Sequence, residues 1–368
     1  MYWAVYITSK HFGNGEVMTV TAEAYVLEAA KAPLVRRSLQ IPAPGPSEAI
    51  VEVIACGLCH TDLGYADGSV PTKKGMPIVL GHEAVGRVVE AGRNFDSLVG
   101  STVLVPAVLP CGECPFCLAG RGNACPNQKM PGNDIDGGFS THFLVPARPL
   151  IKIGSGLSSN IAALSVVADA VSTAYQAILR ANLTAGDVAV VVGSGGVGSF
   201  VVQIANALGA RVLACDIIQD RLQLIGDYGA AQVINLTNLD PKELRKQARA
   251  FAKGVPTLKL KIFECSGSTP GQTTAYGLLE RGATMLQVGY TPNPINVRLS
   301  NLMAFDATIH GTWGCPPEVY PGVLRLIEEG KVKLDPFIAY GPMSKVSDYL
   351  SAMAEHKLEK RMVMDPHK

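Results

Sequence analysis

The 368-residue sequence lacks a surplus of charge of either sign. Its 32 Lys and Arg side chains face 31 Asp and Glu side chains, which gives a formal net charge of +1 at pH 7. This balance creates no overall field toward nucleic acid or an anionic membrane, and we expect neither as a partner. Charged residues make up only 17% of the chain and hydrophobic residues 48%, which favours sheets buried on both faces and a buried subunit interface.

The sequence also lacks a long hydrophobic run and a targeting segment. No apolar stretch approaches the roughly 20 residues that span a bilayer. The first residues have no basic start, apolar centre or small-residue cleavage site, so they do not resemble a signal peptide and a cytoplasmic protein is expected. Recognisable patterning starts at Ala24. Residues 1–22 are therefore expected to be an ordered extension, or in part the product of an overlong start with the natural initiator at Met18.

The nine cysteines are an odd number, and four of them fall in one short segment. Their spacing is C-x2-C-x2-C-x7-C, and the alternatives are a metal site, two disulfides or free thiols. Without a secretion signal, this spacing favours metal. Four thiolates close a tetrahedral zinc site with no open position, and metal affinity then becomes folding energy for a loop without its own core. The predicted structural zinc ligands are Cys111, Cys114, Cys117 and Cys125.

The pattern of the chain predicts an α/β fold with two domains. Residues 23–170 contain short β-like runs broken by Gly and Pro, with loops at 110–128 and 130–138. Residues 171–309 alternate apolar strands and helices, which is typical of a Rossmann-type, doubly wound parallel sheet. Residues 310–368 are predicted to return and complete the first domain. The expected elements of the second domain are strands at 188–192, 211–215, 232–234, 260–264 and 284–288, with a helix at 196–208; a further helix is expected at 321–329.

A dinucleotide-binding motif follows the predicted strand at 188–192. The sequence VVGSGGVG contains G-x-G-x-x-G in the required context, between a strand and a helix. Asp216 ends the next strand, where a carboxylate accepts from the ribose 2′-hydroxyl and favours NAD over NADP. An ordinary strand-end aspartate is the alternative for Asp216, and a solvated helix residue the alternative for Arg221, which blurs the preference. The predicted cofactor-binding residues in this region are Gly193, Gly195, Gly196, Val197, Gly198, Asp216 and Arg221.

Three further segments carry residues typical of a catalytic metal site. They are GLCHTD at 57–62, GHE at 81–83 and DAVSTAY at 169–175. With the cysteine-rich loop and the glycine motif in this order, the chain from about Ala24 to Pro366 resembles the zinc-containing medium-chain alcohol dehydrogenases. The resemblance implies a β-rich, GroES-like catalytic domain, two zinc ions per subunit, NAD as the cofactor, a small-molecule substrate and a homodimer or homotetramer.

By this resemblance, Cys59, His82 and Asp169 are the ligands of a catalytic zinc. Three protein ligands leave one tetrahedral position for water or the substrate oxygen. Many relatives have cysteine at the third position and some have aspartate, so a solvated turn aspartate is the alternative for Asp169. Glu83 matches a residue that visits the metal during ligand exchange. Asp62 matches the carboxylate that orients the histidine ligand.

The resemblance also assigns the residues that handle the proton and the coenzyme. Thr61 matches the hydroxyl that bonds the alcohol and begins proton release. Gly64 stands where relatives often carry a histidine, so the proton is expected to leave through the ribose hydroxyls to water. His60 and Arg361 match contacts to the coenzyme pyrophosphate, and Val288 matches the strand end behind the nicotinamide ring.

The substrate pocket is expected, again by resemblance, near Ala107, Phe139 and Tyr290. The small side chain of Ala107 implies room for a ring or a branched group. Segments 130–139, 166–171 and 310–317 resemble a branch of the family, the 6-hydroxycyclohex-1-ene-1-carbonyl-CoA dehydrogenases, which oxidise a ring alcohol of a CoA thioester in anaerobic benzoyl-CoA breakdown. Basic side chains expected in or near these loops, as partners for CoA phosphates or as scattered solvated charge, are Lys73, Lys74, Arg121, Lys129 and Arg148.

Two alternatives remain open at this point. A general secondary-alcohol or polyol dehydrogenase of the same family has the same metal and coenzyme residues, although a polyol preference needs polar pocket residues. A nucleotide-binding structural or regulatory protein that has lost catalysis is the alternative from another class. Metal content separates the two classes, because a dehydrogenase holds two zinc ions per subunit and a degenerate binder one or none.

Overall fold

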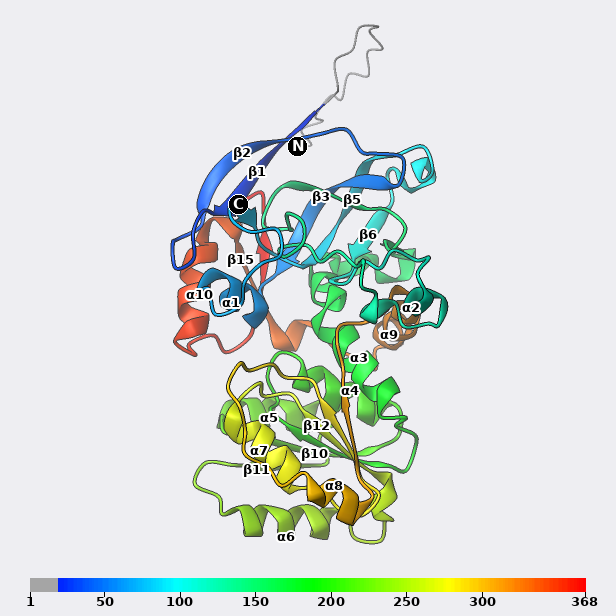
Figure 1. The fold of residues 1–368 in the computed structure, drawn as a ribbon, viewed down its shortest axis with the longest axis vertical. Coiled ribbons are helices and arrows are strands. Elements are labelled where there is room, and N and C mark those ends of the chain that lie inside the picture. The colour runs from blue at the N-terminus through cyan, green and yellow to red at the C-terminus, as the bar shows by residue number, and fades with distance from the viewer. Residues whose placement is uncertain (1–18) are drawn as a thin grey trace, which may run out of the picture.

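The computed structural model describes residues 19–368 (Figure 1). The expectations for residues 1–18, with Met18 as the initiator, lie outside the described residues. The first strand, β1, covers Val20–Leu27 and pairs with β2 (Val35–Ile41) over its length. The strand therefore begins four residues before Ala24, inside the segment expected to be an extension, because pairing with β2 orders it.

The lower half of the molecule is a six-stranded, all-parallel sheet in the order β11-β10-β9-β12-β13-β14 (Figure 1). Alternate residues of the central strand β9 enter two different cores: Ala189 and Val191 pack with α3 and α4, and Val188 and Val190 pack with α6 and α7. A strand buried on both faces needs a continuous apolar sequence. The doubly wound parallel sheet is confirmed. Its strands are β9 (Val188–Val192), β10 (Arg211–Asp216), β11 (Gln232–Asn235), β12 (Leu260–Glu264), β13 (Thr284–Gln287) and β14 (Thr308–Gly311).

The upper half is β-rich and mainly antiparallel. Its seven-stranded sheet has the order β15-β16-β3-β5-β6-β8, with β7 pairing to β3, and a separate sheet has the order β2-β1-β4. The last strand, β16, returns to pair with β3, where Val363 lies opposite Gly57. The strands here are β3 (Glu48–Gly57), β4 (Ile78–Val79), β5 (Glu83–Ala91), β6 (Thr102–Val105), β7 (His142–Pro146), β8 (Ile151–Lys152), β15 (Ile338–Pro342) and β16 (Arg361–Asp365).

The two halves share one hydrophobic core. The 3-10 segment η4 (Ala162–Ala168) contacts β3, β5 and β6 above. Helix α3 follows η4, packs on it and contacts α4 below. No single helix of residues 19–368 is long and apolar enough to cross a membrane; η4 and α3 meet that test only as a bent pair, and here they are core. The helices are α1 (His60–Ala66), α2 (Pro115–Leu118), α3 (Ala170–Arg180), α4 (Gly198–Ala207), α5 (Gln219–Asp227), α6 (Pro241–Phe251), α7 (Thr269–Gly277), α8 (Ser300–Phe305), α9 (Tyr320–Glu328) and α10 (Val346–Ala354).

Candidate active site

The four cysteines of the loop at 110–128 form one cluster. Their Sγ atoms are 3.5 to 3.9 Å apart along the contacts that link them. A disulfide needs about 2.05 Å, so the described cysteines are all free thiols. Four sulfurs at a zinc–sulfur distance of about 2.3 Å form a tetrahedron with edges of about 3.8 Å. The cluster therefore fits the structural zinc that the spacing predicted.

The second cluster brings together residues from three distant segments. One ligand atom each of Cys59, His82, Glu83 and Asp169 lies within 4.8 Å of all the others. Cys59 Sγ is 3.8 Å and His82 Nε2 is 3.6 Å from Asp169 Oδ2. His82 Nε2 is buried and makes no hydrogen bond. A thiol, an imidazole with a bare nitrogen and a carboxylate are the donors that catalytic zinc takes, so the residues fit the ion.

Asp62 contacts two of these ligands, Cys59 and His82, and holds them in position. Cys59 is the N-cap of α1, and its backbone N–H donates to Asp62 Oδ2 at 2.9 Å. Asp62 Oδ1 accepts from the Gly81 N–H at 3.1 Å and lies 3.2 Å from His82 Nδ1. Burial alone lowers the pKa of His82, but the charge of Asp62 and the neighbouring Asp169 and Cys59 side chains together outweigh burial and raise that pKa well above its usual value. Asp62 thus orients the ring so that Nε2 faces the cluster.

Asp169 is positioned by the helix that follows it. It precedes α3, and the Thr173 hydroxyl one turn along donates to its Oδ1 at 2.8 Å. The buried Tyr320 hydroxyl donates to the Ala168 carbonyl at 2.6 Å. Burial raises the pKa of Asp169, but the proximity of His82, the charge of Arg361 and the Thr173 hydrogen bond together outweigh burial and lower that pKa to about 2. These contacts hold Asp169 as a carboxylate inside the cluster rather than as a solvated turn residue. No sequence pattern indicated this role of Tyr320.

Arg361 joins the metal cluster to the nucleotide loop. Its Nη1 lies 2.5 Å from Glu83 Oε1 and donates to the Leu58 carbonyl at 3.4 Å. Its Nη2 would lie 2.6 Å from a Cβ on Gly196, so any larger residue there would displace the guanidinium. Burial, partly offset by Arg361, raises the pKa of Glu83 to about 7. One guanidinium therefore contacts both the carboxylate beside the metal ligand and the loop that receives phosphate.

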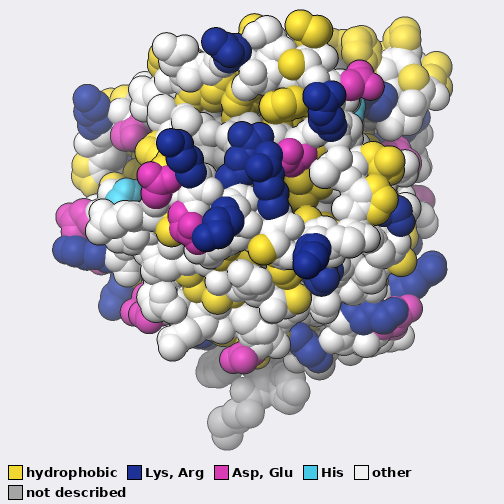
Figure 2. All heavy atoms as spheres, turned by 90° about the horizontal axis from the view of Figure 1, so that it is seen from below, with side chains coloured by type: hydrophobic (Ala, Val, Ile, Leu, Met, Phe, Trp, Pro, Cys, Tyr) yellow, Lys and Arg dark blue, Asp and Glu magenta, His cyan; other side chains and the backbone are white. Residues whose placement is uncertain are grey.

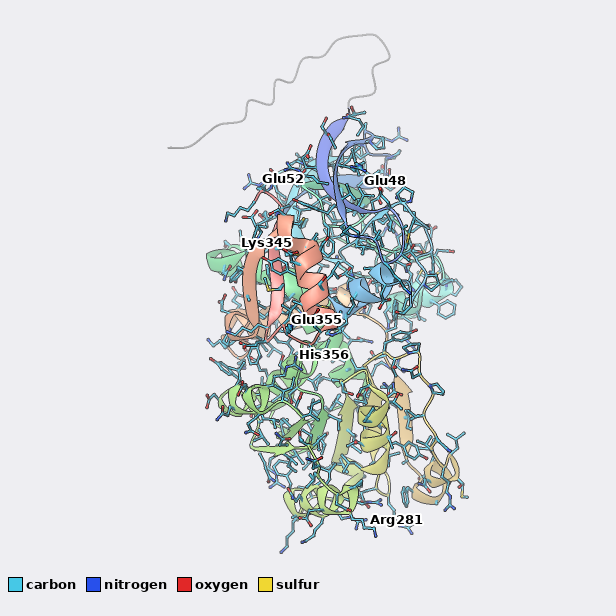
Figure 3. All side chains as sticks on the ribbon, turned by 90° about the vertical axis from the view of Figure 1, so that its left-hand side faces the viewer. Glu48, Glu52, Arg281, Lys345, Glu355 and His356 are labelled. Atoms are coloured by element: carbon cyan, nitrogen blue, oxygen red, sulfur yellow. The ribbon has the colours of Figure 1, made fainter. Side chains whose placement is uncertain are left out.

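The glycine motif forms a tight turn between β9 and α4. Gly193 has a φ of +91°, and a Cβ there would lie 2.6 Å from the Ser266 backbone. Helix α4 begins at Gly198 with no side-chain cap. The N–H groups of Ser199, Phe200 and Val201 already donate to the carbonyls of Gly195 and Val197. The amides left for phosphate oxygens are those of residues 195–198, which donate to no residue of 19–368. Desolvation and the charges of Arg361, His356 and Arg221 lower the pKa of His60 to about 4. These basic groups converge where a pyrophosphate would lie, and His356 lies at the level where the two halves meet (Figure 3).

Asp216 ties the glycine loop to the end of β10. Its buried carboxylate accepts from the N–H groups of Ser194 at 2.6 Å and of Ile217 and Ile218 at 2.8 and 3.0 Å. Arg221 lies close to Gly195, at 3.5 Å from where a Cβ would be. The carboxylate predicted to bind the ribose and the cation Arg221 therefore lie against neighbouring residues of the same loop, Ser194 and Gly195.

This arrangement predicts the effect of replacing Asp216 with serine. Loss of a charged hydrogen bond to the ribose is expected to lower kcat/KM with NAD about 10- to 100-fold. Activity with NADP should rise, because the repulsion of a 2′-phosphate is removed while Arg221 stays. Steady-state kinetics with both coenzymes measure the ratio. Asp220→Asn, an exposed acid on α5, is the matched control and should leave the ratio unchanged.

The pocket residues differ in what they offer a substrate. Ala107 is buried, and its N–H donates to the Ala168 carbonyl beside Asp169. Phe139 has no exposed surface and packs against Gly81. Phe139 therefore packs against the glycine that precedes His82 and lines no open pocket, a correction to its predicted place. Tyr290, three residues beyond the end of β13, is 68% exposed, and the Val288 N–H donates to the Glu264 carbonyl.

Glu264 is a buried carboxylate that the sequence did not single out. It accepts from the Ser266 N–H at 2.8 Å and from Gln287 Nε2 at 2.7 Å. Gln287 also donates to the Gly289 carbonyl at 2.6 Å. Glu264 thereby ties together the loops after β12 and β13, next to the glycine turn. Its position could have indicated this role, because Glu264 is a charged residue at the end of a buried apolar strand.

The nucleotide-binding sheet and the two ligand clusters define a zinc-dependent oxidoreductase of the nicotinamide type. Residues 45–155 match the model of the alcohol dehydrogenase GroES-like domain, and residues 196–329 match that of the zinc-binding dehydrogenases. The chain is 30% identical to an alcohol dehydrogenase of Geobacillus stearothermophilus over 93% of this chain and 99% of the relative. An NAD-dependent alcohol dehydrogenase of Sulfolobus acidocaldarius gives the same identity and coverage. The chain belongs to the zinc-containing medium-chain alcohol dehydrogenase family.

The solved structures agree with this assignment. An alcohol dehydrogenase of Thermotoga maritima superposes with a TM-score of 0.83 and 25% identity, covering 94% of this chain and 99% of that one. The protein is thus an NAD-dependent zinc alcohol dehydrogenase. When bound by Cys59, His82 and Asp169, zinc supplies Lewis acidity that lowers the pKa of an alcohol. The Thr61 hydroxyl, 3.7 Å from Cys59 Sγ, stands at the edge of this cluster, where it is placed to accept the alcohol proton.

Proposed function

We propose that the substrate is a cyclic secondary alcohol carried on a CoA thioester, as in 6-hydroxycyclohex-1-ene-1-carbonyl-CoA. The hydroxyl carbon passes a hydride to NAD, the hydroxyl proton leaves through Thr61, and the product is the conjugated 6-oxo thioester. Three segments resemble those of enzymes with this substrate, and their positions relative to the metal cluster support the proposal.

Each of the three segments contacts a residue in or close to the metal cluster. Segment 130–139 bonds the residue before His82, with the Gly138 N–H donating to the Gly81 carbonyl at 2.8 Å. Segment 166–171 contains Asp169 and accepts from Ala107. In segment 310–317, Gly314 packs against Val108. Segments distant in sequence but adjacent in space are the ones expected to set substrate shape together, and this convergence is the observation that carries the proposal.

The basic residues near these segments divide into two groups. Lys73 pairs with Asp134 at 3.4 Å, and Lys74 pairs with Asp136 at 2.6 Å, so these two are already neutralised. The other three form no ion pair with any residue of 19–368. The candidates for CoA phosphates are therefore Arg121, Lys129 and Arg148.

A substrate panel tests the proposal. The purified protein with NAD is offered the cyclic hydroxyacyl-CoA, the same ring alcohol without CoA, simple secondary alcohols and polyols, and NADH absorbance is followed. The CoA ester is expected to give the highest kcat/KM. In the double variant Arg121→Gln/Arg148→Gln, its KM should rise about tenfold while that of the CoA-free alcohol stays constant. Lys74→Gln is the control. Efficient oxidation of simple alcohols or polyols with the CoA ester ignored contradicts the proposal and favours the general alcohol or polyol alternative.

We propose further that two copies of the chain pair through β14. This strand is hydrogen-bonded to β13 and to no other strand of residues 19–368, so it is an edge. Leu299 and Met303, just before it, are 69% and 79% exposed, and Trp313 after it is 51% exposed. An open edge flanked by apolar side chains is the surface that pairs with a second chain.

Because Met303 lies beside the proposed contact at β14, the substitution Met303→Glu is expected to shift the protein from dimer to monomer. In a two-fold dimer this substitution places two unpaired carboxylates in the interface. The dissociation constant of the dimer should therefore increase by at least about a hundredfold. Light scattering after size exclusion measures the mass. Val99→Glu, also at an exposed apolar position, should leave the mass unchanged. A wild type that is monomeric at micromolar concentration rejects this pairing.

A further inference from the structure

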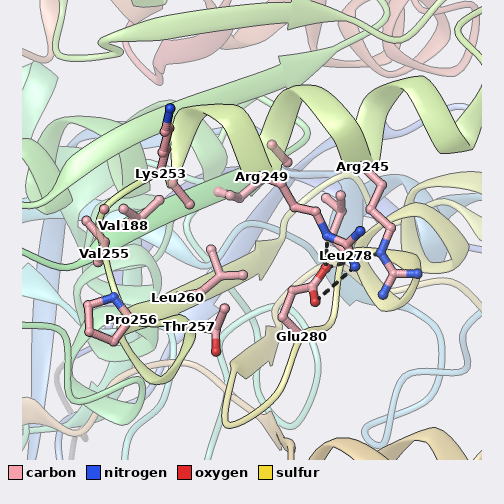
Figure 4. Close-up of a pocket in the computed structure, with 14 residues that line it drawn as sticks. Val188, Arg245, Arg249, Lys253, Val255, Pro256, Thr257, Leu260, Leu278 and Glu280 are labelled. Carbon is pink, nitrogen blue, oxygen red and sulfur yellow. Dashed lines mark hydrogen bonds and ion pairs between the residues drawn. The ribbon is translucent and has the colours of Figure 1, made fainter.

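A pocket with no part in the active site lies beneath α6, at the amino-terminal ends of β9 and β12 (Figure 4). Its volume is about 230 Å³. The glycine loop leaves the opposite, carboxyl end of β9, so the pocket and the coenzyme site are at different ends of the sheet. Figure 3 shows the same separation, with Arg281, next to the pocket residue Glu280, at the lower end and His356 between the halves.

The back of the pocket is apolar. Val188, Leu260, Leu278 and Ala248 line it, and all four are buried. The amphipathic helix α6 begins after the N-cap Asp240 and turns Ala248 toward this wall. An apolar cavity of about 150 Å³ holds a benzene molecule. This pocket therefore has room for one substituted ring or a short branched acyl group.

The mouth of the pocket carries more positive than negative charge. Glu280 is shared between two arginines: Arg249 Nε and Nη2 lie at 2.7 and 3.2 Å from its oxygens, and Arg245 Nε at 3.2 Å (Figure 4). Exposed Lys253 forms no ion pair with any described residue. The pocket lining thus holds one carboxylate and three cations, and of these cations Lys253 extends away from Glu280 (Figure 4). Figure 2 shows this end of the molecule, where Lys and Arg side chains gather with hydrophobic patches between them.

We propose that this pocket binds a small carboxylate with an aromatic or branched aliphatic body. The body occupies the apolar wall, and the carboxylate meets Lys253 and the guanidinium of Arg249, whose Nη1 is not used by Glu280. A neutral apolar molecule leaves the surplus charge unmatched, and a large anion exceeds the volume. The ligand class follows from these two constraints together.

Benzoate is a suitable probe, titrated by calorimetry into the zinc-loaded protein saturated with NADH, so that the coenzyme site is filled. Lys253→Gln is expected to weaken binding about fivefold, which is typical of a partly exposed charge contact. Glu280→Gln removes the competing carboxylate and should tighten binding about fivefold. Lys246→Gln, on the same helix but outside the pocket and paired with Glu243, should change nothing.

The opposite signs separate a binding site from structural damage, because a destabilised pocket weakens binding in both variants. Ala252→Phe places a ring in the pocket and should abolish the benzoate signal while activity and the melting temperature stay at wild-type values. Benzoate binding that is absent, or that is unchanged in both Lys253→Gln and Ala252→Phe, overturns the proposal. If Glu280→Gln does not fold, the comparison of Lys253→Gln with Lys246→Gln decides alone.

Discussion

Replacing Cys59 with alanine is expected to lower kcat/KM by at least about a thousandfold while the protein stays folded. Cys59 is one of the three protein ligands of the catalytic cluster, and its Sγ lies 3.8 Å from Asp169 Oδ2. Without it, two ligands remain and the ion is lost or misplaced. Loss of Lewis-acid stabilisation of several kcal/mol corresponds to three or more decades of rate.

Cys56→Ala is the matched control for this experiment. Cys56 is also buried, three residues earlier at the end of β3, but its thiol packs toward Gly138 and belongs to neither cluster. Steady-state kinetics and zinc analysis should show one zinc ion lost in Cys59→Ala and none in Cys56→Ala. A Cys59→Ala protein that keeps two zinc ions and activity within tenfold of wild type would remove the basis for the catalytic assignment.

Replacing Cys114 with alanine is expected to produce the largest loss of stability. The short helix α2 after it has no buried residue, and Phe116 and Leu118 are 49% and 77% exposed. The lobe therefore has no core of its own, and thiolate–metal bonds take the place of one. Structural zinc contributes on the order of 10 kcal/mol to small lobes of this kind. A loss of even a third of that lowers the melting temperature by about 10 °C in a domain of this size.

Calorimetry, zinc analysis and limited proteolysis check this prediction. The variant should lose one zinc ion, and proteases should cut between residues 110 and 128. Glu113→Ala is the control, because the Glu113 side chain is exposed and is not a member of the cluster, and its backbone N–H, which bonds Cys111, is kept in alanine. A Cys114→Ala protein that resists proteolysis and melts with the wild type means that packing, rather than metal, holds the lobe.

The local sequence was sufficient to predict the structure where the contacts of a segment lie within that segment. Strands β9 and β12 have the predicted bounds because each is a short apolar run ended by Gly or by a polar turn. The cysteine spacing likewise brings four thiols together in one loop. In these cases the contacts that matter lie within a few residues of one another, and the pattern predicts them directly.

The rest depended on contacts between distant segments, which no local pattern encodes. The Tyr320 bond to Ala168 joins residues 152 positions apart. The pairing of Lys73 and Lys74 with acids near 135 removes two predicted phosphate contacts. Phe139 was placed by resemblance at a pocket, whereas packing on Gly81 buries it completely. Tertiary packing determines the position of each of these side chains.

The pairing of β16 with β3 has a consequence for how the enzyme is made. Arg361 opens β16, and the Met362 carbonyl accepts from the Leu58 N–H at 2.9 Å, next to the ligand Cys59. A growing chain emerges from the ribosome N-terminus first, so Cys59, His82 and Asp169 appear long before their partner strand. A nascent chain can gather metal early, but it cannot close the phosphate site until its final residues are released.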